Sequence, residues 1–400
     1  MRHTSIQSFV KIGIFNLALV ALIGCIMRYK IGFEFPFFDQ KYLLHGHSHF
    51  AFTGWVSHIL FTLMLVFISE FDVQTERFNR LVWANLVCAY GMLISFVIQG
   101  YGPVSILFST LSIFISFGFA LQYFKALASI QHPSTKWFKA ALIFNVLSSL
   151  GTFFLAYMMM TKSLQQEAYL GSVYFFLHFQ YSGWFFFAIM GLLVSKLSKL
   201  QGYKDNDLIF KSFFWACLPA YFLSILWAKL PWYLYILPVF AVILQLSGLY
   251  LLLVQIHDLK TIIIKNWPKY VRLFFGLALA ALIIKLSLQA GSIFPEISKL
   301  AFGFRSIVIA YLHLVLLGIT TLFLLGYLLL CGYIPNVKSA QIALILFVIG
   351  VFSNELILMV QGIASFGYIL VPYLNEMLLV VSVLMLSSVV YLFSTLRKLN

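Results

Sequence analysis

Near its N-terminus the chain reads Phe15-Asn16-Leu17-Ala18-Leu19-Val20-Ala21-Leu22-Ile23, a stretch without charge and with one polar side chain. The stretch lies in an apolar run over 9–27, and a helix needs about 20 apolar residues to cross a bilayer. Seven of its nine residues recur in the same order over 275–283. It therefore predicts a membrane-spanning helix and an internal repeat.

The composition of the whole chain agrees with this interpretation. Of the 400 residues, 62% are hydrophobic and 10% are charged, whereas soluble domains carry about 25% charged residues. This composition excludes a water-soluble enzyme, a disordered chain and a small disulfide-stabilised secreted domain. We expect an all-α, polytopic membrane protein.

Twelve stretches are long and apolar enough to form transmembrane helices. They are 9–27, 43–69, 81–99, 103–124, 138–160, 171–195, 209–228, 233–256, 271–290, 306–330, 340–361 and 373–395. The loops between them leave no room for a soluble domain. We therefore expect a single transmembrane domain over 1–400.

The starts of the spans recur about every 130 residues, which is four helices. Ile14-Phe15-Asn16, for example, returns as Ile143-Phe144-Asn145. The pattern predicts three pseudo-repeats of four helices, over about 1–130, 131–265 and 266–400.

The basic residues predict the orientation. Of 26 Lys and Arg, 18 lie in the two termini and in the loops after even-numbered spans. Because positive charge favours the cytoplasmic side, both termini are expected there. The net charge of +14 thus indicates topology and no nucleic-acid partner; the expected surroundings are membrane lipid, in the inner membrane of a bacterium.

Three histidines occupy equivalent positions of the repeats: His49, His178 and His313 lie in spans 2, 6 and 10. Each is followed five residues later by a glycine. Ionisable residues inside a membrane are expensive and mark functional sites by default. The alternative is that each makes a hydrogen bond between helices.

Span 2 is the richest in histidine. His45 and His49 are four residues apart and share a helix face, whereas His47 lies on the same side as His58. Neutral imidazole binds copper, zinc and haem iron. His45, His49 and His313 are therefore candidate haem ligands, and His178, His49 and His47 are candidate metal ligands.

Four further polar residues in the spans are candidates for a supporting role. Gln180 and Tyr181 follow His178 and are candidates to orient it. Lys285 and Glu355 are candidates to pair, to relay protons or to bind a haem propionate. The alternative for Lys285 is to extend toward the membrane surface.

The chain resembles the haem–copper oxidase subunit I superfamily in its twelve spans, cytoplasmic termini and sets of four helices. The segments His178-Phe179-Gln180-Tyr181 and Phe186-Phe187-Ala188-Ile189-Met190-Gly191 are similar to that family's histidine-rich helix 10. The start of span 2 resembles the His-Ala-His element of the NnrS-type haem–copper membrane proteins, which are linked to nitric-oxide metabolism.

Several features depart from the oxidase pattern. Span 7 lacks the adjacent histidines that complete the copper site, span 10 has His313 alone, and the propionate-binding arginine pair is absent. The resemblance therefore implies one haem, held by His49 or His45 opposite His313, rather than an oxygen-reducing centre. His178 matches the copper-ligand helix.

The resulting hypothesis is a haem-binding membrane protein, with copper as a second cofactor, in respiratory or nitric-oxide-linked redox chemistry. Catalytic residues are unknown. Quinol or cytochrome c would be the electron donor, and partner subunits are conceivable. The alternatives are a transporter of a metal ion or small molecule that uses the same histidines, and a non-catalytic haem or gas sensor or assembly partner.

Overall fold

The computed structural model describes residues 3–163, 165–228 and 230–398. This described part is helical and contains no strand. Eleven of its helices are long and apolar enough to cross a membrane. The prediction of an all-α, multi-pass integral membrane protein is confirmed.

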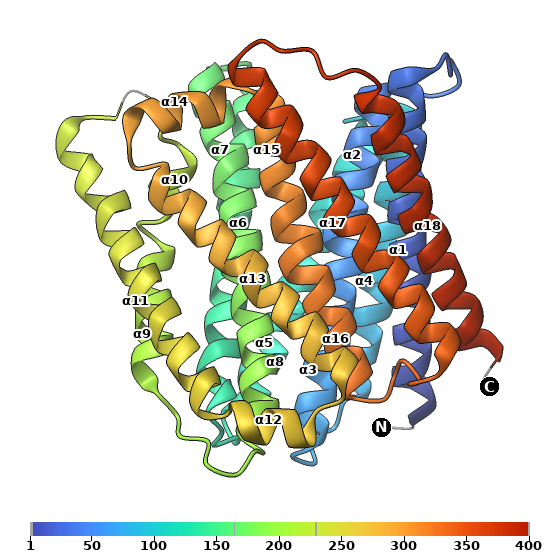
Figure 1. Cartoon of the computed structure of the whole chain (residues 1–400), viewed down its shortest axis with the longest axis vertical. Helices are drawn as coiled ribbons and strands as arrows, with labels where there is room; N and C mark the ends of the chain where they lie inside the picture. The colour runs from blue at the N-terminus through green and yellow to red at the C-terminus, as the bar shows by residue number, and fades with distance from the viewer. Residues whose placement is uncertain (1–2, 164, 229, 399–400) are drawn as a thin grey trace. The chain divides into compact units, whose positions relative to one another are not determined.

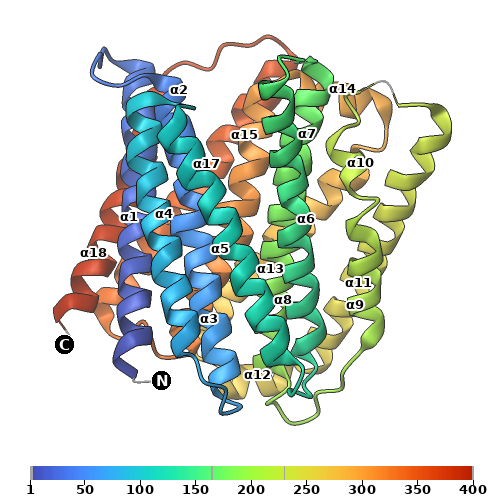
Figure 2. The same cartoon turned by 180° about the vertical axis from the view of Figure 1, so that it is seen from behind.

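The chain forms two compact units. Unit 1 comprises 1–126 and 321–400. Its elements are α1 (His3–Gly32), α2 (Gln40–Phe50), η1 (Ala51–Ser57), α3 (His58–Ser69), α4 (Glu76–Gln99), α5 (Pro103–Leu127), α16 (Leu322–Leu330), α17 (Lys338–Phe366) and α18 (Leu374–Lys398). Helix α18 packs against α1 and α17, and α2 packs against α1 and α4 (Figures 1 and 2).

Unit 2 comprises 127–320. Its elements are α6 (Ser134–Met160), α7 (Gln166–His178), η2 (Phe179–Phe185), α8 (Phe186–Leu197), α9 (Asp207–Cys217), α10 (Tyr221–Ser224), η3 (Trp232–Tyr235), α11 (Ile236–Asp258), α12 (Lys260–Asn266), α13 (Lys269–Gly291), α14 (Pro295–Gly303), α15 (Arg305–His313) and η4 (Leu314–Thr321), whose last residue belongs to unit 1. Helix α6 packs against α7 and α8, and α11 against α9 and α13.

One predicted span is wrong as a continuous helix. The stretch 209–228 is divided between α9, which ends at Cys217, and the four-residue α10. Pro219 lies between them and has no N–H to donate. The amide of Tyr221 bonds to the carbonyl of Leu218 at 3.2 Å instead of to that of Cys217. The tightened turn ends the α-helix and leaves the Cys217 carbonyl without its helical partner.

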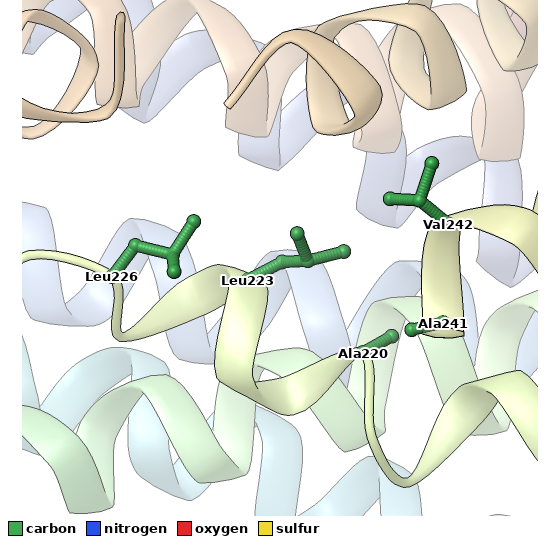
Figure 3. Packing of buried hydrophobic residues seen from close by; sticks show 5 residues of the cluster. All are labelled: Ala220, Leu223, Leu226, Ala241 and Val242. Atoms are coloured by element: carbon green, nitrogen blue, oxygen red, sulfur yellow. The ribbon is translucent and has the colours of Figure 1, made fainter. Parts of the chain in front are cut away.

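The segment after this break is fixed by close apolar packing. Ala220, Leu223 and Leu226 form a buried cluster with Ala241 and Val242 of α11 (Figure 3). Lipid tails are as apolar as these side chains, so van der Waals packing rather than exclusion of water stabilises the contact. The break is therefore a fixed part of the fold.

Three spans share an irregularity that was not predicted. Each contains a π-helical turn, and π-turns inside α-helices occur frequently at functional sites. Each turn begins one or two residues after one of the three aligned histidines, His49, His178 and His313. Each also contains the glycine that follows its histidine: Gly54 in η1, Gly183 in η2 and Gly318 in η4. The three turns thus lie at corresponding positions of the expected repeats; the boundaries of the repeats themselves are still a prediction.

The π-turn of span 6 lies tightly against α6. A Cβ atom placed on Gly183 would approach the Cβ atom of Phe144 to 2.6 Å. Phe144 cannot withdraw its Cβ atom without moving the backbone of α6. Glycine at this position thus allows η2 and α6 to contact closely.

We predict that Gly183→Ala lowers the free energy of unfolding by about 1–3 kcal/mol, the usual range for overpacking. The matched control is Gly276→Ala, because a Cβ atom there meets nothing within 4 Å. Thermal unfolding of the two variants in detergent measures the difference. Equal stability of the two variants would contradict the packing described.

Candidate functional site

In unit 1, His45 and His49 lie on one face of α2 beside Phe96 and Tyr101. The His49 ring stacks on Phe96 with centroids 4.4 Å apart, and its Nε2 lies 3.2 Å from the Tyr101 hydroxyl. The His45 ring meets Tyr101 edge-on at 4.6 Å. Its Nε2 is buried and forms no hydrogen bond in the described structure. The expected His45–His49 pair is therefore present, with one nitrogen lacking a partner.

Aspartate at the start of α2 positions this pair. Asp39 caps the helix by accepting hydrogen bonds from the amides of Lys41 and Tyr42. An N-cap of this kind satisfies amides that have no partner inside the helix. It fixes the first turn of α2 and with it the register of the histidines that follow.

The other two histidines of span 2 lie elsewhere. His47 is directed at α1, where a Cβ atom on Gly24 would come within 3.3 Å of its Cε1. His58 is fully buried and donates from Nε2 to the carbonyl of Phe9 at 2.8 Å. His47 is thus separate from the His45–His49 face, and its role as a metal ligand stays a prediction.

Asparagine side chains satisfy the π-turn η1. Asn16 donates to the Gly54 carbonyl at 2.6 Å, and Asn85 donates to the Thr53 carbonyl at 3.1 Å. Tyr90 in turn donates to the amide oxygen of Asn16. A π-turn releases carbonyls from the α-helical pattern, and lipid offers them no donor. Asn16 therefore stabilises the π-turn that follows His49 by supplying a donor to one of its carbonyls.

In unit 2, His178 is fully buried at the end of α7. Its Nε2 donates to the Cys217 carbonyl at 2.8 Å, and its Nδ1 lies 3.5 Å from the hydroxyl of Ser224. The carbonyl is the one that the break of span 7 releases. His178 therefore supplies its missing donor, and both ring nitrogens face protein groups.

The residues after His178 have different partners. Gln180 donates to Asn145 at 3.0 Å and to Ser148 at 2.8 Å, both on α6. The Tyr181 hydroxyl forms side-chain hydrogen bonds with Ser224 and Tyr311. Tyr181 thus reaches His178 through Ser224, whereas Gln180 joins η2 to α6.

Lys285 of α13 is buried, with 4% of its surface exposed. Its ammonium donates to the Ser182 hydroxyl at 3.0 Å and lies 5.9 Å from the centre of the Tyr181 ring. Glu355, its expected partner, belongs to unit 1, where its carboxyl accepts a hydrogen bond from Asn354 at 3.2 Å. The pairing of Lys285 with Glu355 stays a prediction.

His313 is the last residue of α15, before η4. Its Nδ1 donates to the Ile309 carbonyl one turn earlier, at 2.8 Å. In the neutral ring this bond leaves the lone pair on Nε2. That is the tautomer in which histidine commonly binds a metal.

Several residues of these sites were not predicted. Phe96 and Tyr101 border the histidines of unit 1, and Cys217, Ser224 and Tyr311 border His178 and Tyr181. Proline at position 219 could have predicted the break near Cys217 from the sequence. Nothing in the sequence predicted the remaining neighbours, because tertiary packing brings them to the histidines and to Tyr181.

No cluster of three or more His, Cys, Asp or Glu side chains able to hold a metal ion occurs among the described residues. Comparisons with protein-family models and with curated proteins find no match to this chain. The functional interpretation therefore depends on the geometry of the histidines and of the groups around them.

We predict that His178→Ala lowers the free energy of unfolding by about 1–3 kcal/mol, because it leaves the buried Cys217 carbonyl without a donor. His257→Ala is the control, since His257 is exposed near the end of α11. Thermal or chemical unfolding in detergent measures both. A loss no greater than that of the control would show that the bond at the break is unimportant.

Proposed function

We propose that this protein binds haem through imidazoles of its histidine-bearing spans. Each unit offers candidate ligands of its own: His45 and His49 in unit 1, and His313 in unit 2. The eleven long apolar helices make this chain an integral multi-pass membrane protein. Haem binding is a further property that we propose.

The observation that carries the proposal is the buried Nε2 of His45, which has no hydrogen-bond partner in the described structure. A buried polar atom left unsatisfied costs about 1–3 kcal/mol. Coordination to iron would remove this cost. His49, four residues away, is held by Phe96 and Tyr101 and offers the alternative imidazole on the same face.

The tautomer of His313 supports the same chemistry. A backbone carbonyl holds Nδ1–H, and this bond orients the ring and increases the basicity of Nε2. Histidines that bind metals commonly have such a second hydrogen bond. Bound haem would supply one-electron chemistry.

His178 is not among the proposed haem ligands, because its two nitrogens face Cys217 and Ser224. A copper site from His178, His49 and His47 stays a prediction, as do a quinol or cytochrome c donor and partner subunits. We therefore propose haem binding and no catalytic reaction. A haem protein that acts as a non-catalytic sensor agrees with this proposal as well as an enzyme does.

We predict a sharp α-band in the reduced-minus-oxidised spectrum of protein purified from cells supplied with haem. His313→Ala should abolish or shift this band, and so should His45→Ala or His49→Ala, whichever supplies the ligand. His257→Ala should leave it unchanged. Metal analysis of the same samples tests for copper.

Two results would contradict the proposal. One is wild-type protein without an α-band. The other is a band that survives in His313→Ala, His45→Ala and His49→Ala alike, because the iron would then have other ligands.

One observation favours a second candidate function, transport of a small solute. The break in span 7 lies against the π-turn of span 6, and discontinuous helices form the substrate sites of many transporters. Uptake of solute into liposomes containing the protein, with no haem in the preparation, would support this alternative.

A further inference from the structure

Lys285 has a buried environment rich in hydrogen-bonding groups. The Ser182 hydroxyl of η2 accepts a hydrogen bond from its ammonium, and the Tyr181 ring of η2 lies nearby, with its centre 5.9 Å from the ammonium. The Cys217 thiol donates a hydrogen bond to the carbonyl of Ser182 at 3.8 Å. These four side chains are at most 7% exposed. They come from η2, α9 and α13, all within unit 2.

The charge of Lys285 has no counterpart in this cluster. Within the described part of unit 2, no carboxylate forms an ion pair with Lys285, and the neighbouring groups are hydroxyls, a thiol and the imidazole of His178. An isolated ammonium is strongly unfavourable in a low-dielectric interior. The cation therefore needs an anion from outside the cluster, or it must lose its proton.

The surrounding groups suit a bound anion better than a bound cation. The ammonium carries three N–H donors, and Ser182 accepts from one of them. The hydroxyl group of Ser182 can also donate. A monovalent anion is favoured over a multivalent one, because burying each additional charge raises the cost of dehydration.

A cavity of about 520 Å³ lies beside the N-terminal half of α7, also within unit 2. Its wall includes Glu167 and Phe175 of α7 and Tyr221 of α10. The Tyr221 hydroxyl donates to the Gly171 carbonyl at 3.0 Å, and its ring lies 6.1 Å from that of His178. Tyr221 thus borders the cavity and lies near His178, whereas Lys285 and Ser182 do not line the cavity.

We propose that Lys285 and Ser182, beside the ring of Tyr181, form a binding site for a small monovalent anion, inorganic or carboxylate, next to the broken span 7. Lys285 supplies the charge, and the hydroxyl group of Ser182 supplies a hydrogen bond. The site needs no haem. A missing α-band leaves this inference intact, and a failure to bind anions leaves the haem proposal intact.

The test is binding of chloride, nitrite and formate to the purified protein in a gluconate buffer of constant ionic strength. Ligands that bind only the folded state raise the unfolding midpoint in a saturable way. We expect at least one of the three anions to do so for the wild type. Equilibrium binding of the same anion, added in radioactive form, gives the affinity directly.

Lys285→Met removes the charge and keeps most of the length of the side chain, which becomes one atom shorter. We expect it to weaken binding at least tenfold, while Lys269→Met, at the exposed start of the same helix, binds as the wild type does. In buffer without the probe anion, Lys285→Met should be at least as stable as the wild type, because it removes a buried charge.

Ser182→Ala provides a second test if Lys285→Met does not fold. It retains the ammonium and should weaken binding several-fold. The inference is overturned if none of the three anions gives a saturable response. It is also overturned if the folded variants of Lys285 and Ser182 respond as the wild type does.

Discussion

A backbone carbonyl inside a membrane must find its donor within the protein, and this requirement governs the irregular parts of the structure. Where span 7 breaks, His178 donates to the carbonyl of Cys217. Where span 2 widens into a π-turn, Asn16 and Asn85 donate to carbonyls of Gly54 and Thr53. The polar side chains of the spans are thus first of all partners for the backbone.

This structural use separates the histidines by chemistry. His178 and His58 each use Nε2 to donate to a carbonyl of another element. His313 uses Nδ1 to donate within its own helix, which places the lone pair on Nε2. His45 retains a buried Nε2 without a partner. His178 and His313, which lie at equivalent positions of the expected repeats, therefore differ in which ring nitrogen donates a hydrogen bond to a backbone carbonyl.

Apolar runs predicted the helical class and eleven of the spans, because a bilayer requires about 20 apolar residues in each helix. The apolar runs did not predict the break in 209–228, since its composition stays apolar while Pro219 interrupts the hydrogen bonding. They did not predict the π-turns either, because one extra residue in a helical turn leaves the hydropathy of the segment unchanged.

The candidate site was predictable only in part. The spacing of His45 and His49 placed them on one face, as the structure shows, but the neighbours of Gln180 and Lys285 depend on tertiary packing. Gln180 was expected to orient His178 and instead bonds to Asn145 and Ser148. Ser182, which holds the ammonium of Lys285, had no distinguishing signal in the sequence.

The most direct test of the central claim is the haem content of the purified protein, measured by extraction as the pyridine complex and compared with the protein concentration. The account predicts haem in a fixed stoichiometric ratio to the chain. Protein that is folded, made in cells with ample haem and nevertheless free of it would contradict the account.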